Sequence, residues 1–240
     1  MSDSTLRGRK VVVIGGTSGI GFGVARAARD AGATVVVASS SVANVEAAIQ
    51  RLGDGVEGSA VDVTNEADVA NFFERIGPYD HLVFTAGDWG ARGGGPPAGW
   101  DITSAGAIFA VRFWGAVIAV KYGHRLISQD GSITITDGAM AHRPRRGAAL
   151  NAAMLGAIEH LARGLAVDLA PVRVNAVCPG LVRTEALKNV PEEQLLKMTG
   201  RQPVPRPGDP AEIAEAYLYL MRGTYTTGQV LRVDGGSALT

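Results

Sequence analysis

The chain has little cysteine, few aromatic residues and no net charge. Its single cysteine, Cys178, excludes an internal disulfide and is typical of a reducing compartment. Lysine and arginine together number 23, and so do aspartate and glutamate, so the composition predicts no basic surface for nucleic acid or for a membrane. The N-terminus carries no apolar signal segment, and we therefore expect a cytoplasmic protein.

Long hydrophobic runs are also missing. The longest apolar stretch, Ala105–Val120, is shorter than the roughly 20 residues that a membrane helix needs, and it contains Arg112. An arginine at the centre of a bilayer costs about 2.5 kcal/mol or more, which favours a buried core helix instead. With 46% apolar residues, the 240 residues can bury the core of one α/β domain, and we expect residues 1–240 to form a single domain.

The stretch that organises the chain is Lys10–Gly21, KVVVIGGTSGIG. Its β-branched run does not alternate with polar residues, which predicts a strand buried on both faces. The glycines that follow allow a tight turn into a helix, and the amides at a helix start form an anion site. The pattern therefore predicts a nucleotide-binding loop. Its expected cofactor-binding residues are Gly15, Thr17, Ser18, Gly19 and Ile20.

Three motifs resemble the short-chain dehydrogenase/reductase family. The spacing of Gly15, Gly19 and Gly21 resembles the family's TGxxxGxG loop, with Ile14 where the family usually has threonine. The segment RVNAVCPGLVRT, residues 173–184, resembles its RVNxVxPGxxxT pattern, and VDGG at 233–236 resembles its closing motif. The resemblance covers almost the whole chain and implies a pyridine dinucleotide cofactor.

Strands and helices alternate along the sequence. Strands are expected at 11–14, 34–38, 56–61, 80–85, 131–136, 172–177 and 229–233. Helices are expected at 21–31, 42–52, 65–75, 101–127, 149–169 and 210–221, with a glycine-rich loop at 88–99. This order predicts an α/β fold of the Rossmann type, a doubly wound, seven-stranded parallel sheet with helices on both faces.

The end of the second strand favours NADP(H) over NAD(H). Folds that keep NAD place an acidic residue there, and its carboxylate would repel a 2′-phosphate. This chain has Ser39, Ser40 and Ser41 instead, and their hydroxyls can donate to a phosphate. The alternative is that these serines only cap the helix at 42–52.

The resemblance implies further cofactor contacts. Asp62 and Val63 correspond to the family's adenine-binding pair, although Asp62 could instead be an ordinary helix cap. Ala86 and Gly87 stand where the backbone passes the cofactor ribose. The nicotinamide and phosphates are expected at Pro179, Gly180, Val182 and Thr184, and a substrate lid is expected at 185–208.

The family's catalytic residues are not found at the matching positions. Aligning by GSITIT and RVNAVCPG puts Leu150 at the tyrosine position and Met154 at the lysine position, with Asp137 for the serine and Arg112 for the asparagine. There is no tyrosine between residues 123 and 217 and no lysine between 121 and 188, so no shift of register recovers the pair. Leu150 and Met154 can also be interpreted as a repacked core.

Two charged replacements of opposite sign suggest an ion pair. A buried charge is tolerated chiefly when it is paired, so we hypothesise a contact between Arg112 and Asp137 across the pocket. His142 is a further candidate for the pocket because it titrates near neutral pH, but a histidine in an arginine-rich loop is more often solvated.

These patterns leave three hypotheses. The first is an NADP(H)-dependent oxidoreductase acting on a carbonyl or alcohol with a non-standard active site, in which Asp137, His142 or water supplies the proton. The second is an inactive nucleotide-binding sensor or structural partner, and the third is a non-redox lyase. The helix at 149–169 is apolar nearly all round, which predicts a homodimer or homotetramer. No metal site, membrane or nucleic acid partner is predicted.

Overall fold

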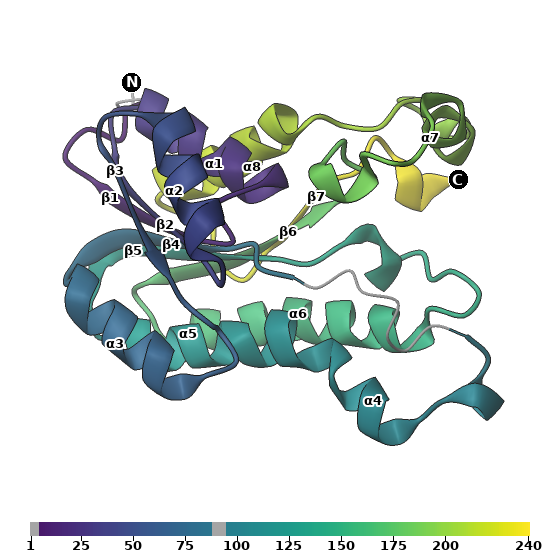
Figure 1. Ribbon diagram of the computed structural model, residues 1–240, viewed down its shortest axis with the longest axis horizontal. Helices are drawn as coiled ribbons and strands as arrows, with labels where there is room; N and C mark the ends of the chain where they lie inside the picture. Colours follow the sequence, from purple (N-terminus) through teal and green to yellow (C-terminus); the bar gives the residue numbers. More distant parts are fainter. Residues whose placement is uncertain (1–4, 88–94) are drawn as a thin grey trace.

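The computed structural model describes residues 5–87 and 95–240, so residues 88–94 of the expected glycine-rich loop lie outside it. Within these residues the chain forms one parallel sheet with the strand order β3-β2-β1-β4-β5-β6-β7 (Figure 1). The strands are β1 (Lys10–Ile14), β2 (Thr34–Ser39), β3 (Val56–Ala60), β4 (Tyr79–Phe84), β5 (Ile127–Thr136), β6 (Arg173–Pro179) and β7 (Val230–Val233). The predicted doubly wound α/β fold is confirmed.

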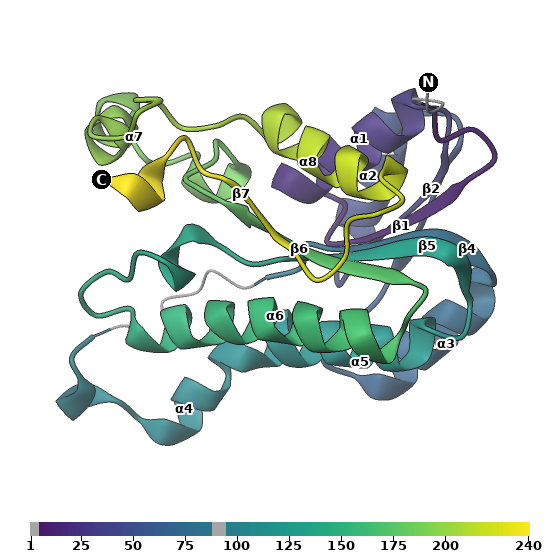
Figure 2. The ribbon, with the colours of Figure 1, turned by 180° about the vertical axis from the view of Figure 1, so that it is seen from behind.

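Helices cover both faces of the sheet. One face carries α1 (Gly19–Asp30), α2 (Val42–Leu52) and α8 (Pro210–Arg222). The other carries α3 (Glu66–Ile76), α5 (Gly115–Gly123) and α6 (Ala149–Asp168). Figures 1 and 2 show the two layers from opposite sides, with α6 lying beneath β5 and β6.

The absence of alternation in β1 has a direct structural cause. Val11 and Val13 point into the core beneath α1 and α8, whereas Val12 and Ile14 point into the core beneath α3, α5 and α6. Side chains of a strand alternate between faces, and here both faces are covered by helices. All four residues are therefore buried, with exposures of 1% or less.

The prediction of one continuous helix at 101–127 is wrong. The segment forms a short helix α4 (Ile102–Gly106), a π-helical turn η2 (Ala110–Trp114) and then α5, which ends at Gly123. In the π turn the amide of Gly115 donates to the carbonyl of Ala110, which widens the helix by one residue. Glycines are poor helix formers, and their positions at 106, 115 and 123 lie at the ends of the observed pieces.

The expected lid at 185–208 contains a 3₁₀ turn, η4 (Glu185–Leu187), and the short helix α7 (Glu192–Thr199). Its two ends are held close to the sheet. Val182 and Gly208 form a parallel bridge, and the amide of Val204 donates to the carbonyl of Gly235 at 3.0 Å. None of the helices in the described ranges has the length and apolar character needed to cross a membrane.

Candidate functional site

A cleft of about 1120 Å³ opens at the carboxyl ends of the strands. This edge is where open α/β sheets bind ligands, because the loops that follow neighbouring strands converge there. Every residue that the sequence predicts to bind the cofactor lies in the wall of this cleft. They are Gly15, Thr17, Ser18, Gly19, Ile20, Ser39, Ser40, Asp62, Val63, Ala86, Gly87, Pro179, Gly180, Val182 and Thr184.

The loop between β1 and α1 forms the floor of the cleft. Gly15 has a φ of +88°, and a Cβ added there would lie 2.6 Å from the amide nitrogen of Ala86, so only glycine fits. The amide of Gly19, at the start of α1, donates to the carboxylate Oε2 of Glu185 at 2.8 Å. A helix N-terminus attracts anions, and this carboxylate therefore occupies a position suited to a phosphate. Sequence analysis did not single out Glu185.

The serines after β2 divide into two roles. Ser41 is the N-cap of α2, because its hydroxyl accepts a hydrogen bond from the amide of Asn44 at 3.3 Å. Ser39 and Ser40 instead line the cleft, together with Asn44, which the sequence analysis missed. The capping interpretation thus holds for Ser41, and two hydroxyls remain on the cleft wall.

Asp62 is held by its own turn. Its Oδ1 accepts hydrogen bonds from the Thr64 amide at 2.9 Å and the Thr64 hydroxyl at 2.7 Å, and these bonds lower the pKa of Asp62. The N-cap of α3 is Asn65, whose side chain accepts from the amides of Ala67 and Asp68. The alternative interpretation of Asp62 as the cap of α3 is therefore wrong.

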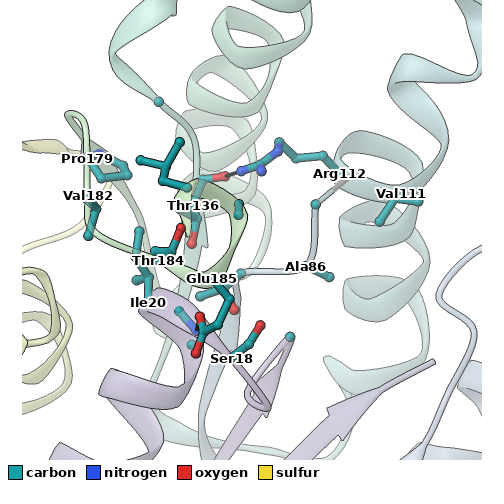
Figure 3. Close-up of a pocket in the computed structure, with 18 of the residues that line it drawn as sticks. Ser18, Ile20, Ala86, Val111, Arg112, Thr136, Pro179, Val182, Thr184 and Glu185 are labelled. Atoms are coloured by element: carbon teal, nitrogen blue, oxygen red, sulfur yellow. Dashed lines mark hydrogen bonds between the residues drawn. The ribbon is translucent and has the colours of Figure 1, made fainter. Parts of the chain in front are cut away.

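Arg112 reaches the cleft from the π turn and is 3% exposed. Its Nη1 donates to the carbonyl oxygen of Thr136 at 3.3 Å (Figure 3). It also donates to the carbonyl oxygen of Asp137 at 3.5 Å. Burial lowers the pKa of Arg112, and nearby Tyr217 and Asp137 partly oppose this. The predicted ion pair between Arg112 and Asp137 is wrong, because no ion pair among the described residues joins them. The guanidinium instead donates to backbone carbonyls at the end of β5.

Asp137 does not line the cleft, contrary to prediction. The hydroxyl of Thr136 lies on the α8 side of β5, where it contacts the Phe84 carbonyl at 2.9 Å and the Tyr217 hydroxyl at 2.6 Å. Successive side chains alternate, so Asp137 falls on the α6 side, and its exposure is 0%. The neighbouring cleft wall is formed by Gly138, Ala139 and Met140.

His142, Leu150 and Met154 are also absent from the cleft wall. Met154 is 4% exposed and packs into the core between the sheet and α6, which confirms the repacked-core interpretation for this residue. Leu150 is half-buried at the start of α6. The side chain of His142 is neither fully solvated nor in the cleft, because its Nε2 lies 2.5 Å from Oε1 of Glu159.

Asp137 and His142 instead belong to a group behind the cleft wall, which we call the buried cluster. Its members are Asp137, His142, Glu159 and Cys178, and their ligand atoms all lie within 4.8 Å of one another. Burial, with the contact to Glu159 second, raises the pKa of Asp137 to about 8. Burial and the neighbouring Asp137 likewise raise the pKa of the Cys178 thiol.

Four arginines and several apolar side chains line the cleft. Besides Arg112, the residues Arg143, Arg145 and Arg146 line it, and apolar surface comes from Val111, Met140, Leu187 and Met198. The carboxylates among the described lining residues are Asp62 and Glu185, which lie at the predicted adenine and phosphate positions. The sequence analysis noted the arginines after β5 but did not place them at the cleft.

Comparisons with known proteins match this arrangement over the whole chain. A family model described as "Enoyl-(Acyl carrier protein) reductase" matches residues 15–238. The short-chain dehydrogenase/reductase ATR9 of Stachybotrys chlorohalonatus is 34% identical, over 98% of this chain and 99% of the relative.

Two solved structures are similar in fold and sequence. A small-chain dehydrogenase in complex with NADPH superposes with a TM-score of 0.80 and 34% identity, covering 97% of this chain and 99% of the other. The MalC reductase/Diels-Alderase of Malbranchea aurantiaca superposes with a TM-score of 0.92 and 31% identity over the full length of both chains. With its nucleotide loop, its closing motifs and its cleft at the carboxyl edge of the sheet, the chain belongs to the short-chain dehydrogenase/reductase family of NAD(P)-dependent oxidoreductases.

Proposed function

We propose that the protein is an NADP(H)-dependent oxidoreductase that interconverts a carbonyl compound and its alcohol in a non-standard active site. The observation that carries the proposal is the cleft itself. One continuous wall joins the predicted dinucleotide residues to a buried cation, Arg112, at the end where the nicotinamide is expected. A structural relative of 34% identity was solved with NADPH, which supports the choice of cofactor.

The preference for NADP(H) rests on the end of β2. Ser39, Ser40 and Asn44 present hydroxyl and amide donors to the cleft, and no carboxylate follows β2 within the described lining. A 2′-phosphate carries negative charge and accepts hydrogen bonds, so such donors favour it while an acidic residue would repel it.

Arg112 is our candidate for the group that stabilises the transition state. Hydride addition to a carbonyl leaves negative charge on its oxygen, and a fixed cation that is itself buried stabilises that charge more strongly than a cation in bulk water. Asp137 and His142, the acids suggested by the sequence, turn away from the cleft and toward Glu159. We therefore assign charge stabilisation to Arg112 and protonation of the oxygen to water entering the open cleft.

The arginines at the substrate end indicate the class of substrate. Arg143, Arg145 and Arg146 line the cleft together with the apolar side chains of Val111, Met140, Leu187 and Met198. Guanidinium groups bind carboxylates and phosphates through paired hydrogen bonds. We therefore propose a carbonyl substrate that combines an apolar body with an anionic group.

The experiment measures binding and turnover separately. NADPH and NADH are titrated by cofactor fluorescence, and matched ketones and aldehydes with and without a carboxylate are then offered with NADPH. Oxidation of NADPH, faster with the anionic member of each pair, supports the proposal. Tight NADPH binding with no oxidation across the panel supports instead the sensor or structural partner, and a failure to bind either dinucleotide contradicts both.

The assembly and location are part of the same proposal. We propose a homodimer or homotetramer in the reducing cytoplasm, because α6 is apolar around most of its surface and Val167 on it is 78% exposed. Trp114, which immediately precedes α5 on the same side of the sheet, is also exposed. Light scattering coupled to size exclusion measures the mass, and a monomer at micromolar concentration would contradict the assembly.

A further inference from the structure

The buried cluster brings together residues from four separate segments of the chain. Asp137 follows the end of β5, and Cys178 lies on the adjacent strand β6, where the Asp137 amide donates to the Val177 carbonyl at 3.0 Å. Glu159 lies on α6, and His142 follows the 3₁₀ turn η3 (Ala139–Ala141). Asp137 and Cys178 are both 0% exposed, and Glu159 is 5% exposed. The arrangement is thus set by the sheet and α6 and not by one flexible loop.

The cluster lacks the hydrogen bonds that buried carboxylates require. Neither oxygen of Asp137 has a hydrogen-bond partner among the described residues, although the side chain is completely buried. Carboxylates only accept hydrogen bonds, so Asp137 and Glu159 cannot satisfy one another unless one of them holds a proton. Arg163 contacts the other side of Glu159, with 3.8 Å between Nη2 and Oε2. A buried carboxylate without a hydrogen-bond partner is costly, and a bound cation would remove that cost.

The set of donors identifies what would occupy the centre of the cluster. One imidazole nitrogen, one thiolate sulfur and two carboxylate oxygens suit Zn²⁺ and its transition-metal neighbours, whereas Mg²⁺ and Ca²⁺ prefer oxygen alone. We propose that the buried cluster binds one divalent transition-metal ion of the zinc class, beside the cofactor cleft and separate from it. The unpartnered Asp137 carboxylate, aimed into the cluster, is the observation that distinguishes it from a chance gathering of acids.

The geometry requires only a small adjustment. Zinc bonds of about 2.0–2.3 Å in a tetrahedron place the donor atoms roughly 3.3–3.8 Å apart. The four donor atoms already lie within 4.8 Å of one another, and His142 and Glu159 approach to 2.5 Å, so shifts of about 1 Å would produce the site. The imidazole of His142 is the most exposed member, at 28%, and offers the route by which an ion enters.

An ion in this place would brace one wall of the cleft. The chain between Asp137 and His142 carries Gly138, Ala139 and Met140, all of which line the cleft. The metal would tie both ends of this segment to β6 and α6. We therefore assign the ion a structural role that positions the substrate end of the cleft, with no step of the reaction passing through it.

The test uses the single cysteine as a spectroscopic reporter. Full-length protein is stripped with a chelator and titrated with Co²⁺, whose bond to a thiolate gives an ultraviolet charge-transfer band. Because Cys178 is the chain's only cysteine, the band has one possible source. We expect saturation at one Co²⁺ per chain, displacement by Zn²⁺, and a higher thermal midpoint for the metal-bound protein.

Variants separate the cluster from other surface groups. Cys178→Ser should abolish the band, and Glu159→Gln should weaken Co²⁺ binding by at least the roughly 10- to 100-fold that loss of an outer-shell partner costs. His160→Gln is the matched control, since His160 lies on α6 next to Glu159 but is exposed and outside the cluster. Circular dichroism and NADPH titration establish that each variant is folded, and His142→Gln replaces Cys178→Ser if the latter fails.

Three results would overturn the proposal. One is folded wild-type protein that takes up no Co²⁺ or Zn²⁺ at millimolar concentration. Another is binding that gives no thiolate band and is unchanged in Glu159→Gln, which would place the ion elsewhere on the surface. The third is an infrared band of a protonated carboxyl, absent in Asp137→Asn and persisting under excess Zn²⁺, which would show that a shared proton fills the centre. None of these results would alter the cofactor and substrate measurements that test the proposed function.

Discussion

The guanidinium of Arg112 fills the space that a side chain at Gly87 would need. A Cβ added at Gly87 would overlap Nη2 of Arg112 and lie 2.5 Å from its Cζ. Gly87 follows β4, whereas Arg112 comes from the π turn, so the two meet only in the folded chain. The resemblance explained Gly87 by the passage of the cofactor ribose, and the structure adds a second reason for a glycine there.

Replacing Gly87 with alanine should therefore impair the cleft. The new methyl group must displace Arg112 or the β4 end, and such overpacking typically costs about 1–3 kcal/mol, which is about 5- to 160-fold in an equilibrium constant. We expect NADPH affinity or turnover in Gly87→Ala to fall by about fivefold or more. Fluorescence titration and steady-state rates measure both. Gly99→Ala is the control, because nothing lies within 4 Å of a Cβ at Gly99.

Arg112→Met should separate chemistry from cofactor binding. The substitution keeps most of the length and apolar volume but removes the charge that we assign to the developing alkoxide. Loss of such a group lowers kcat by roughly 10²- to 10³-fold. NADPH affinity should change only a few-fold. Unchanged kcat in a folded Arg112→Met variant would sink the assigned role of this residue.

Ser39→Asp should reverse the cofactor preference. A carboxylate at the end of β2 would repel the 2′-phosphate of NADPH, and repulsion between charges a few ångströms apart near a protein surface readily exceeds the 1.4 kcal/mol of a tenfold change. We expect NADPH to bind at least about tenfold more weakly, with NADH affected far less. Ser39→Asn is the control, because asparagine has the size of aspartate but no charge, and this variant should bind NADPH like the wild type. Equal losses of NADPH affinity in the two variants would point to a steric effect.

Glu185→Gln should strengthen NADPH binding. The Glu185 carboxylate accepts a hydrogen bond from the Gly19 amide, at the position suited to the cofactor phosphates. Binding must displace this anion, so removing its charge should tighten NADPH binding about two- to fivefold, most clearly at low salt. Glu193→Gln, on exposed α7, is the control. Weaker binding in Glu185→Gln would mean that the carboxylate supports the cofactor-bound form.

His81 should make stability depend on pH. It is 3% exposed, its Nδ1 lies 2.9 Å from the Ser132 hydroxyl, and burial lowers the pKa of His81 from 6.5 to about 4. The unfolded chain therefore binds a proton first as the pH falls. This contribution to the free energy of unfolding is complete above pH 6.5 and decreases between pH 6.5 and 4, by about 3 kcal/mol in total.

Denaturant titrations across this range should detect the difference against His81→Gln. Glutamine can still hydrogen-bond to Ser132 but does not titrate, so the variant should lose less stability on acidification. Parallel pH curves for the two proteins would contradict the shifted pKa.

Strands β1 and β2 could be predicted closely because their residues are apolar on both faces, whereas β5 begins at Ile127, four residues before the predicted start at 131. The cleft residues followed, since the loops after parallel strands converge on one edge. The direction of Asp137 could not be predicted, because alternation had to be counted past the strand end without knowing which face Thr136 occupies. The buried cluster could not be predicted from the sequence for a related reason. Its members stand at positions 137, 142, 159 and 178, and only the packing of α6 against β5 and β6 brings them together.

The π turn at Ala110–Trp114 ties the position of the cleft's cation to the length of the chain. Each residue of an α-helix turns by about 100°, so a one-residue deletion that restored an ordinary helix there would rotate Arg112 relative to α5. Either the guanidinium would leave the cleft, or Gly115 would lose its fit against Val63 and Phe84. Homologous segments that shorten this turn would thus be expected to carry a different residue facing the substrate, even where the arginine is kept.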